Sequence, residues 1–184
     1  MKIQTLLTTL LFAIQLNSCI TPESEQASTE ESLYYDIQEM LNPEIARLQS
    51  EKPMVRKVTM MNGETKTEEI KVEDWKKELA VFLNANINKP ILKGSYEIEK
   101  KEGLITYTAL KEDLPIKEMK VKYVGEPTTK IEAVEEKETV LFHNKRELGV
   151  TITDGKIASY SLVGYQKMPA KDSLVYKIEA TILY

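Results

Sequence analysis

The sequence predicts an α+β domain in which N-terminal amphipathic helices pack on an antiparallel β-meander. Two stretches in the first half repeat apolar residues at helical spacing. From Lys93 onward, apolar and polar residues alternate with the period of two that is typical of half-buried strands. Tight turn signals separate these strands, and tight turns make sequential strands antiparallel neighbours. The apolar face of such a sheet needs a cover, so we expect either helices on it or a sheet curled into a partly open barrel.

The chain has 184 residues, a hydrophobic content of 42% and a formal net charge of -4. This composition is typical of a globular protein, and the length suits one domain. The chain has no excess of basic residues that could contact the phosphates of a nucleic acid, so we expect no nucleic-acid partner. The single cysteine excludes a disulfide within the chain. We divide the chain into a signal peptide (1–18), a lipid anchor with an acidic tether (19–31) and a single domain (32–184).

Two helices are expected before the strands. The first covers Ser32 to Lys52, where an apolar stripe recurs at spacings of three and four. Pro43 lies within it, so we expect one kinked helix or two short helices, the second capped by Asn42. The second helix covers Glu73 to Asn86 and can be capped by Asp74. Its expected apolar face consists of Trp75, Leu79, Phe82 and Leu83.

Hairpins are predicted at two places. Asn62-Gly63 separates strand-like stretches at 54–61 and 64–72, and both residues tolerate the positive φ of a tight turn. The second arm is so polar that we expect it at an edge of the sheet. Asp154-Gly155 marks the other hairpin. The strands expected after residue 93 are 96–99, 104–110, 116–124, 130–134, 139–143, 148–153, 157–163 and 174–182.

The first nineteen residues predict the destination of the protein. Lys2 gives a positive start, and an apolar stretch of signal-peptide length follows over residues 3–16. That stretch is shorter than the roughly 20 apolar residues of a membrane-spanning helix. It ends in Leu16-Asn17-Ser18-Cys19, which contains the only cysteine. One interpretation is an ordinary signal peptide with a cysteine near its end.

The same four residues resemble a bacterial lipobox, with Leu16 at the aliphatic position, Ser18 at the small position and Cys19 at the lipid-bearing position. The resemblance implies cleavage before Cys19, a diacylglyceryl group on its sulfur and acylation of the new amino terminus, such as with palmitate. Two or three acyl chains anchor a protein firmly, because each buried methylene contributes about 0.8 kcal/mol. The membrane is therefore one expected partner, through the acyl chains on Cys19.

Residues 20–31 are polar and acidic, which is typical of a flexible tether. Glu23 and Glu25 resemble the acidic surface-export signal that follows the cysteine in lipoproteins of Bacteroidota. Ile20 stands where the enterobacterial sorting rule places an inner-membrane retention aspartate. The resemblance therefore implies an outer-membrane lipoprotein that faces the periplasm or the cell surface.

Candidate catalytic residues are sparse, so we expect no enzyme, no cofactor and no metal. His143 is the only histidine, and it lacks the histidine or cysteine partners of a zinc site. No Gly-x-Ser-x-Gly elbow accompanies it. Carboxylates are plentiful, including Glu112-Asp113 and Glu135-Glu136, but they lie near lysines and are typical of a solvated surface. Two carboxylates that converge in a cleft beside His143 would favour an envelope enzyme instead.

Nine tyrosines form the one compositional excess. If several share an exposed strand face, they can stack on sugars or line an amphipathic pocket; the alternative is that they fill half-buried strand positions. The possible ligand-facing aromatics are Tyr96, Tyr107, Tyr123, Tyr160 and Tyr176. We therefore expect a non-enzymatic module that binds an envelope protein, glycan or lipid. The alternative is a carrier of an apolar ligand, similar in outline to lipoprotein-localisation carriers of the LolA/LolB type.

Overall fold

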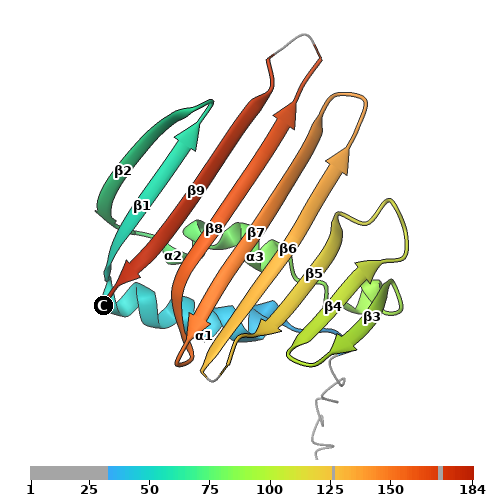
Figure 1. Ribbon diagram of the computed structural model, residues 1–184, viewed down its shortest axis with the longest axis horizontal. Coiled ribbons are helices and arrows are strands. Elements are labelled where there is room, and N and C mark those ends of the chain that lie inside the picture. Colours follow the sequence, from blue (N-terminus) through green and yellow to red (C-terminus); the bar gives the residue numbers. More distant parts are fainter. Residues whose placement is uncertain (1–32, 126, 170–171) are drawn as a thin grey trace, which may run out of the picture. The chain divides into compact units, whose positions relative to one another are not determined.

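The computed structural model of the protein describes residues 33–125, 127–169 and 172–184. These residues form a compact unit dominated by one antiparallel sheet (Figure 1). Its helices are α1 (Ile37–Glu51), α2 (Trp75–Glu78), α3 (Ala80–Asn84) and the short 3-10 helix η1 (Pro90–Leu92). Its strands are β1 (Met54–Met61), β2 (Glu64–Lys71), β3 (Tyr96–Lys101), β4 (Leu104–Ala109), β5 (Ile116–Tyr123), β6 (Thr128–Glu138), β7 (His143–Thr153), β8 (Lys156–Lys167) and β9 (Leu174–Leu183).

The first predicted helix is present as the single helix α1. Its amino terminus is capped by Asp36, whose carboxylate accepts hydrogen bonds from the backbone amides of Gln38 and Glu39 at 2.9 and 3.0 Å. Pro43 lies inside α1 without dividing it, so the second helix that Asn42 would have capped does not form. α1 ends at Glu51, and the residue that caps it, Lys52, adopts the left-handed conformation.

The second predicted helix is divided into two short pieces, α2 and α3, which meet at Leu79. Asp74 caps α2 as predicted, since its side chain accepts a hydrogen bond from the amide of Lys77 at 3.0 Å. The expected apolar face is confirmed, because all four of its members are buried. The break therefore leaves the buried stripe in place.

The sheet is an open one. Its strand order is β2-β1-β9-β8-β7-β6-β5-β4-β3, and every pair is antiparallel. The run from β3 to β9 is the predicted meander, and the predicted hairpin of β1 and β2 joins it at β9. β2 forms one edge, as its polarity predicted, and β3 forms the other. The sheet formed by the described residues therefore has two free edges, and the barrel alternative is wrong.

One predicted strand, 139–143, is wrong. The structure places Thr139–Phe142 in the turn between β6 and β7, and β7 begins at His143. The side-chain oxygen of Thr139 accepts hydrogen bonds from the amides of Leu141 and Phe142, at 3.2 and 3.1 Å. This local hydrogen bonding competes with strand pairing and turns the chain. The flanking strands are longer than predicted, with eleven residues each.

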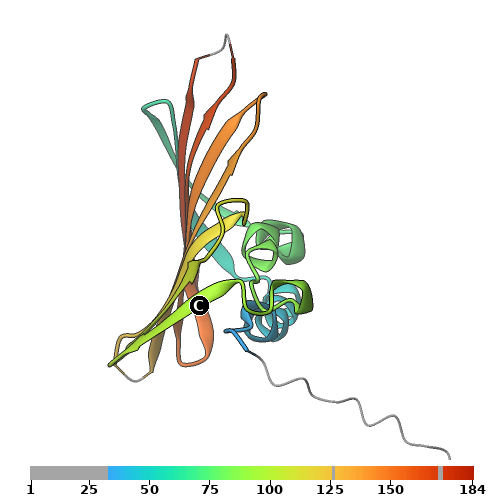
Figure 2. The same ribbon diagram turned by 90° about the vertical axis from the view of Figure 1, so that its right-hand side faces the viewer.

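The helices lie together on one face of the sheet, and the opposite face is uncovered (Figure 2). The covered face is apolar, because Val121, Ile131, Val150, Tyr160 and Ala180 form one cross-strand row beneath the helices. The helices contribute fully buried side chains to the same core, among them Leu41, Leu48, Trp75 and Leu79. Helices packed on a sheet were predicted, but nine strands outweigh these few helical turns, so the described domain is mostly β.

Candidate functional site

The uncovered face of the sheet, called the open face below, is the candidate site. Side chains alternate between the two faces of a strand, so the residues between buried positions point to the open face. One cross-strand row on this face runs from β5 to β1 through the middle of the sheet. Its members are Lys120, Glu132, Gly149, Ser161, Glu179 and Val58.

Small side chains lie in the middle of this row. Gly149 on β7 faces Ser161 on β8, and a Cβ atom at position 149 would lie 2.7 Å from the Ser161 Oγ. Thr151 and Ser159 form the next pair along the same two strands. A glycine inside a strand is unfavourable unless something approaches its backbone closely. The open face therefore has a low region over β7 and β8, where small side chains leave its surface close to the strand backbone.

Charged side chains rise on the β5–β6 side of this low region. Glu132 accepts hydrogen bonds from Lys122 at 2.5 Å and forms an ion pair with Lys130 at 2.8 Å. Burial raises the pKa of Glu132, and the hydrogen bonds from Lys122 and Lys130 lower it. The lowering effects together outweigh the burial, so the pKa of Glu132 lies below its usual value. Glu118 and Lys120 form another pair at 2.5 Å. These charged side chains pair with one another across β5 and β6.

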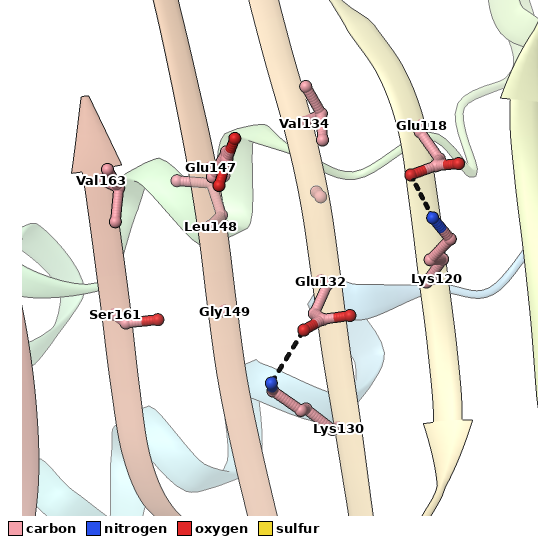
Figure 3. Close-up of a pocket in the computed structure, with 11 residues that line it drawn as sticks. Glu118, Lys120, Lys130, Glu132, Val134, Glu147, Leu148, Gly149, Ser161 and Val163 are labelled. Atoms are coloured by element: carbon pink, nitrogen blue, oxygen red, sulfur yellow. Dashed lines mark hydrogen bonds and ion pairs between the residues drawn. The ribbon is translucent and has the colours of Figure 1, made fainter. Parts of the chain in front are cut away.

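Two shallow depressions adjoin each other on the open face. The first has a volume of about 340 Å³ and extends over β5 to β8 (Figure 3). The second has a volume of about 410 Å³ and extends over β6 to β9 and β1. Both are lined by Lys130, Gly149 and Ser161, so they meet at the low region of β7 and β8. Figure 3 shows the Lys130–Glu132 and Lys120–Glu118 pairs on one side of the Gly149 position.

The five tyrosines expected to face a ligand do not form an exposed aromatic surface. By register, all five belong to the helix-covered face of the sheet. Tyr96, Tyr107 and Tyr160 are buried in the core, whereas Tyr123 is 50% exposed at the end of β5. Burial raises the pKa of Tyr96 to about 12, and Tyr34 adds to that rise. Tyr96, Tyr107 and Tyr160 therefore fill the interior.

Tyr176 has a separate structural role. It is partly exposed on β9, and its ring lies over Gly164 of β8, where an added Cβ would come within 2.0 Å of the ring. The ring covers backbone that the glycine leaves bare. Tyr160, in contrast, donates a hydrogen bond to Glu78 at 2.7 Å and links β8 to α2. Tyr160 borders the second depression, but by register its side chain belongs to the helix-covered face, as does that of Tyr176.

Carboxylates do gather near His143, as the enzyme hypothesis required. An open depression of about 600 Å³ is lined by Glu112, Asp113, Glu136 and Glu138, together with Pro115, Lys117 and Lys137. Glu136 Oε1 lies 2.8 Å from His143 Nε2, and this hydrogen bond keeps the pKa of Glu136 below its usual value. The described residues contain no group of three His, Cys, Asp or Glu side chains placed to hold a metal ion. The pair is partly exposed and links two strands near the β6–β7 turn.

The lipobox residues Leu16 and Ser18, the lipidation site Cys19 and the tether lie outside the described residues. Within residues 33–125, 127–169 and 172–184, no helix is long and apolar enough to cross a membrane. The lipid anchor therefore stays a prediction from the sequence.

The residues of the two depressions were missed by the sequence analysis. A signal was present, since the alternation of Leu148, Val150 and Ile152 already placed Gly149 and Thr151 on the opposite face. It did not reveal that Gly149 lies beside Ser161, because that depends on the register between β7 and β8.

Comparisons with known proteins add no relative. No protein-family model, curated protein or solved structure matches the chain.

Proposed function

We propose that the protein is a lipid-anchored, non-enzymatic binding module of the bacterial cell envelope, and that its partner binds on the open face of the sheet. The lipobox-like Leu16-Asn17-Ser18-Cys19 supports the anchor and an outer-membrane location. The acidic tether that follows supports a domain held at a distance from the bilayer. The sequence and its charge pattern support these points, and the face that the helices leave uncovered supports the choice of binding surface.

The observation that carries the proposal is the pair of adjoining depressions on a face that the helices leave uncovered. They are open and shallow, and charged and hydroxyl side chains line them together with apolar ones such as Val58, Val134 and Val163, unlike the concave and mostly apolar pockets that hold small molecules. Shallow surfaces of mixed polarity suit a macromolecule, whose contacts are spread and include many hydrogen bonds. An envelope protein with an extended, charged surface is the partner that fits best.

The alternative of an apolar carrier has less support. A carrier needs room between the helices and the sheet for its ligand. Here that layer is filled by side chains with no exposed surface, among them Leu41, Leu48, Trp75, Leu79 and Ile87. Binding an acyl chain there would require the helices to separate from the sheet, at the cost of close packing.

Site-specific photocrosslinking in intact envelopes tests the proposal. A photoreactive residue at Ser161, in the low region, should give a discrete crosslinked partner. The matched control is Thr65, which is also on the open face but lies on the edge strand β2, away from both depressions. Equal crosslinking at the two positions, or none at Ser161, would contradict the proposal.

A second variant controls for the chemistry of the crosslinker. Gly149→Val fills the space between the two depressions, and the nearest atom it meets is the movable Ser161 Oγ. We expect Gly149→Val to fold and to reduce crosslinking from the neighbouring position 159 by roughly tenfold, the loss expected when a central contact is blocked. Unchanged crosslinking from a folded variant would show that the partner does not lie over β7.

A further inference from the structure

The turn between β6 and β7, residues 139–142, carries two of the most exposed apolar side chains of the described domain. Val140 is 94% exposed and Leu141 is 73% exposed. The turn joins two strands of eleven residues, and the upper ends of β6 to β9 reach beyond the helices (Figure 2). The β6–β7 turn therefore lies at one end of the described domain, beyond the helices (Figure 2).

Turn geometry does not require these side chains. The other tight hairpins of the sheet use Asn62-Gly63, Glu102-Gly103 and Asp154-Gly155, and each of these glycines has a positive φ. In the β6–β7 turn, Thr139 alone closes the chain, through backbone and side-chain hydrogen bonds to Leu141 and Phe142. Polar residues would serve equally well at positions 140 and 141, so their apolar character asks for another explanation.

The hydrogen bonding of the turn suits an apolar medium. The Thr139 oxygen accepts the amide protons of both Leu141 and Phe142, and the Phe142 carbonyl accepts from the amide of Thr139 at 2.9 Å. An amide that enters hydrocarbon without a partner costs several kcal/mol. The amides of Thr139, Leu141 and Phe142 already have partners within the turn, so these three amides carry no such penalty when the tip leaves water.

The surroundings of the tip suit a flat, phosphate-bearing surface. The carboxyl end of β8 reaches the same end of the sheet (Figure 1), and Met168, which follows β8, is 38% exposed. Exposed lysines stand near the same strand ends, namely Lys137, Lys145 and Lys167, and the carboxylates of Glu136 and Glu138 stand beside them. Lysine stems can lie along acyl chains while their ammonium groups remain at the level of lipid phosphates. An exposed apolar tip with both lysines and carboxylates beside it suits a lipid headgroup layer, which carries both phosphate and ammonium groups.

We infer that the β6–β7 tip is a membrane-contact site, which inserts Val140 and Leu141 into the headgroup boundary of a bilayer. Two small side chains bind a membrane weakly, as a single short anchor does. A second attachment elsewhere in the chain makes such weak contacts effective, because it raises their local concentration. With the tip inserted, β6 and β7 would lead away from the membrane surface, and the open face would stay accessible to a partner.

Depth-dependent quenching tests this inference. The full-length Cys19→Ser chain keeps its apolar segment 3–16 and has no other thiol. A fluorescent label on Leu141→Cys is compared with the same label on Asp154→Cys, in the polar turn between β7 and β8. Both chains are reconstituted in vesicles of phosphatidylethanolamine and phosphatidylglycerol that contain brominated lipids. We expect quenching at position 141 to be roughly fivefold stronger than at 154, as for an inserted side chain against a solvated one.

Two further variants make the result specific to apolar character. Labelled Val140→Cys should be quenched as strongly as the label at 141, and adding Leu141→Asp should abolish that quenching. A label on Ile91→Cys is the matched control, because Ile91 is apolar and 88% exposed but lies outside the tip. Equal quenching at 141, 154 and 91 would overturn the inference, and so would quenching that survives Leu141→Asp. Neither outcome depends on lipidation of Cys19 or on a partner at the open face.

Discussion

Replacement of Glu44 tests the hydrogen bonds that join α1 to the sheet. Glu44 is a carboxylate only 8% exposed, on the helix. Its Oε2 accepts a hydrogen bond from the amide of Ile157 at 2.9 Å, and both of its oxygens accept from Arg47, at 2.8 and 2.9 Å. The terminal Tyr184 completes the cluster, since its hydroxyl accepts from Arg47 and donates to the Ile157 carbonyl, both at 2.7 Å.

The cost of Glu44→Ala follows from these contacts. The variant leaves a buried amide without an acceptor and a half-buried guanidinium without its bidentate partner. Removing one member of a buried ion pair typically costs 3–5 kcal/mol, and the partial exposure of Arg47 brings the expected loss to about 3 kcal/mol. Glu44→Gln keeps an acceptor for Ile157 and loses only the charge, so we expect it to cost about 1.5 kcal/mol.

Urea unfolding at neutral pH measures both losses, with the fluorescence of Trp75 as the signal. Trp75 is the only tryptophan, and it is fully buried beneath the helices. Tyr184→Phe belongs in the same series, because a double-mutant cycle with Glu44→Ala should show that the two losses are not additive. A loss below about 0.5 kcal/mol for Glu44→Ala would refute the reasoning, since that is the effect of an ordinary surface substitution.

The pH dependence gives a second reading of the same cluster. Burial raises the pKa of Glu44, but the hydrogen bonds from Arg47 and Ile157 lower it below its ordinary value of 4.5. A depressed pKa contributes stability that is present above pH 4.5 and is lost as the pH falls through the lower folded-state value. The gap in free energy of unfolding between the native chain and Glu44→Gln should therefore narrow below pH 4.5. A gap that stays constant down to pH 3 would contradict the assigned contacts.

Three further predictions concern the covered face. The pKa of Tyr96 is raised to about 12, so this residue contributes stability that is present below pH 10 and is lost between pH 10 and 12. Tyr96→Phe should therefore reduce the fall in free energy of unfolding over that pH range, followed by fluorescence. Gly164→Ala must displace the Tyr176 ring and should cost about 1–2 kcal/mol in urea, with most of that cost absent in a Tyr176→Ala background. Tyr160→Phe should cost about 1 kcal/mol by urea unfolding, because Glu78 loses a hydrogen-bond donor; no change would show that water replaces the hydroxyl.

Much of the topology could be predicted because its signals are local. The Asn62-Gly63 and Asp154-Gly155 turns, the Asp74 cap and the period of two along β9 each depend on residues close in sequence. The wrong strand at 139–143 had the same local basis. Its apolar residues are typical of a strand, but a single Thr139 hydroxyl turns the chain there.

The candidate site could not be predicted in the same way, because it depends on long-range register and on which face the helices cover. Gly149 matters only because it lies beside Ser161, and Tyr160 is excluded as a ligand platform only because α2 packs on it. The pairing of β1 with β9, residues more than a hundred positions apart, also decides whether the sheet stays open. Sequence spacing alone carries no information of that kind.

The anchor is the most direct point at which to test the account of the protein as a lipid-anchored module. Intact-mass measurement of the chain extracted from bacterial membranes reads its amino terminus and any covalent lipid in one experiment. We predict a chain that begins at Cys19 and carries a diacylglyceryl group, with or without an amide-linked acyl chain, whereas Cys19→Ala remains unlipidated. A chain cleaved elsewhere, or one with a free thiol at Cys19, would contradict the central claim.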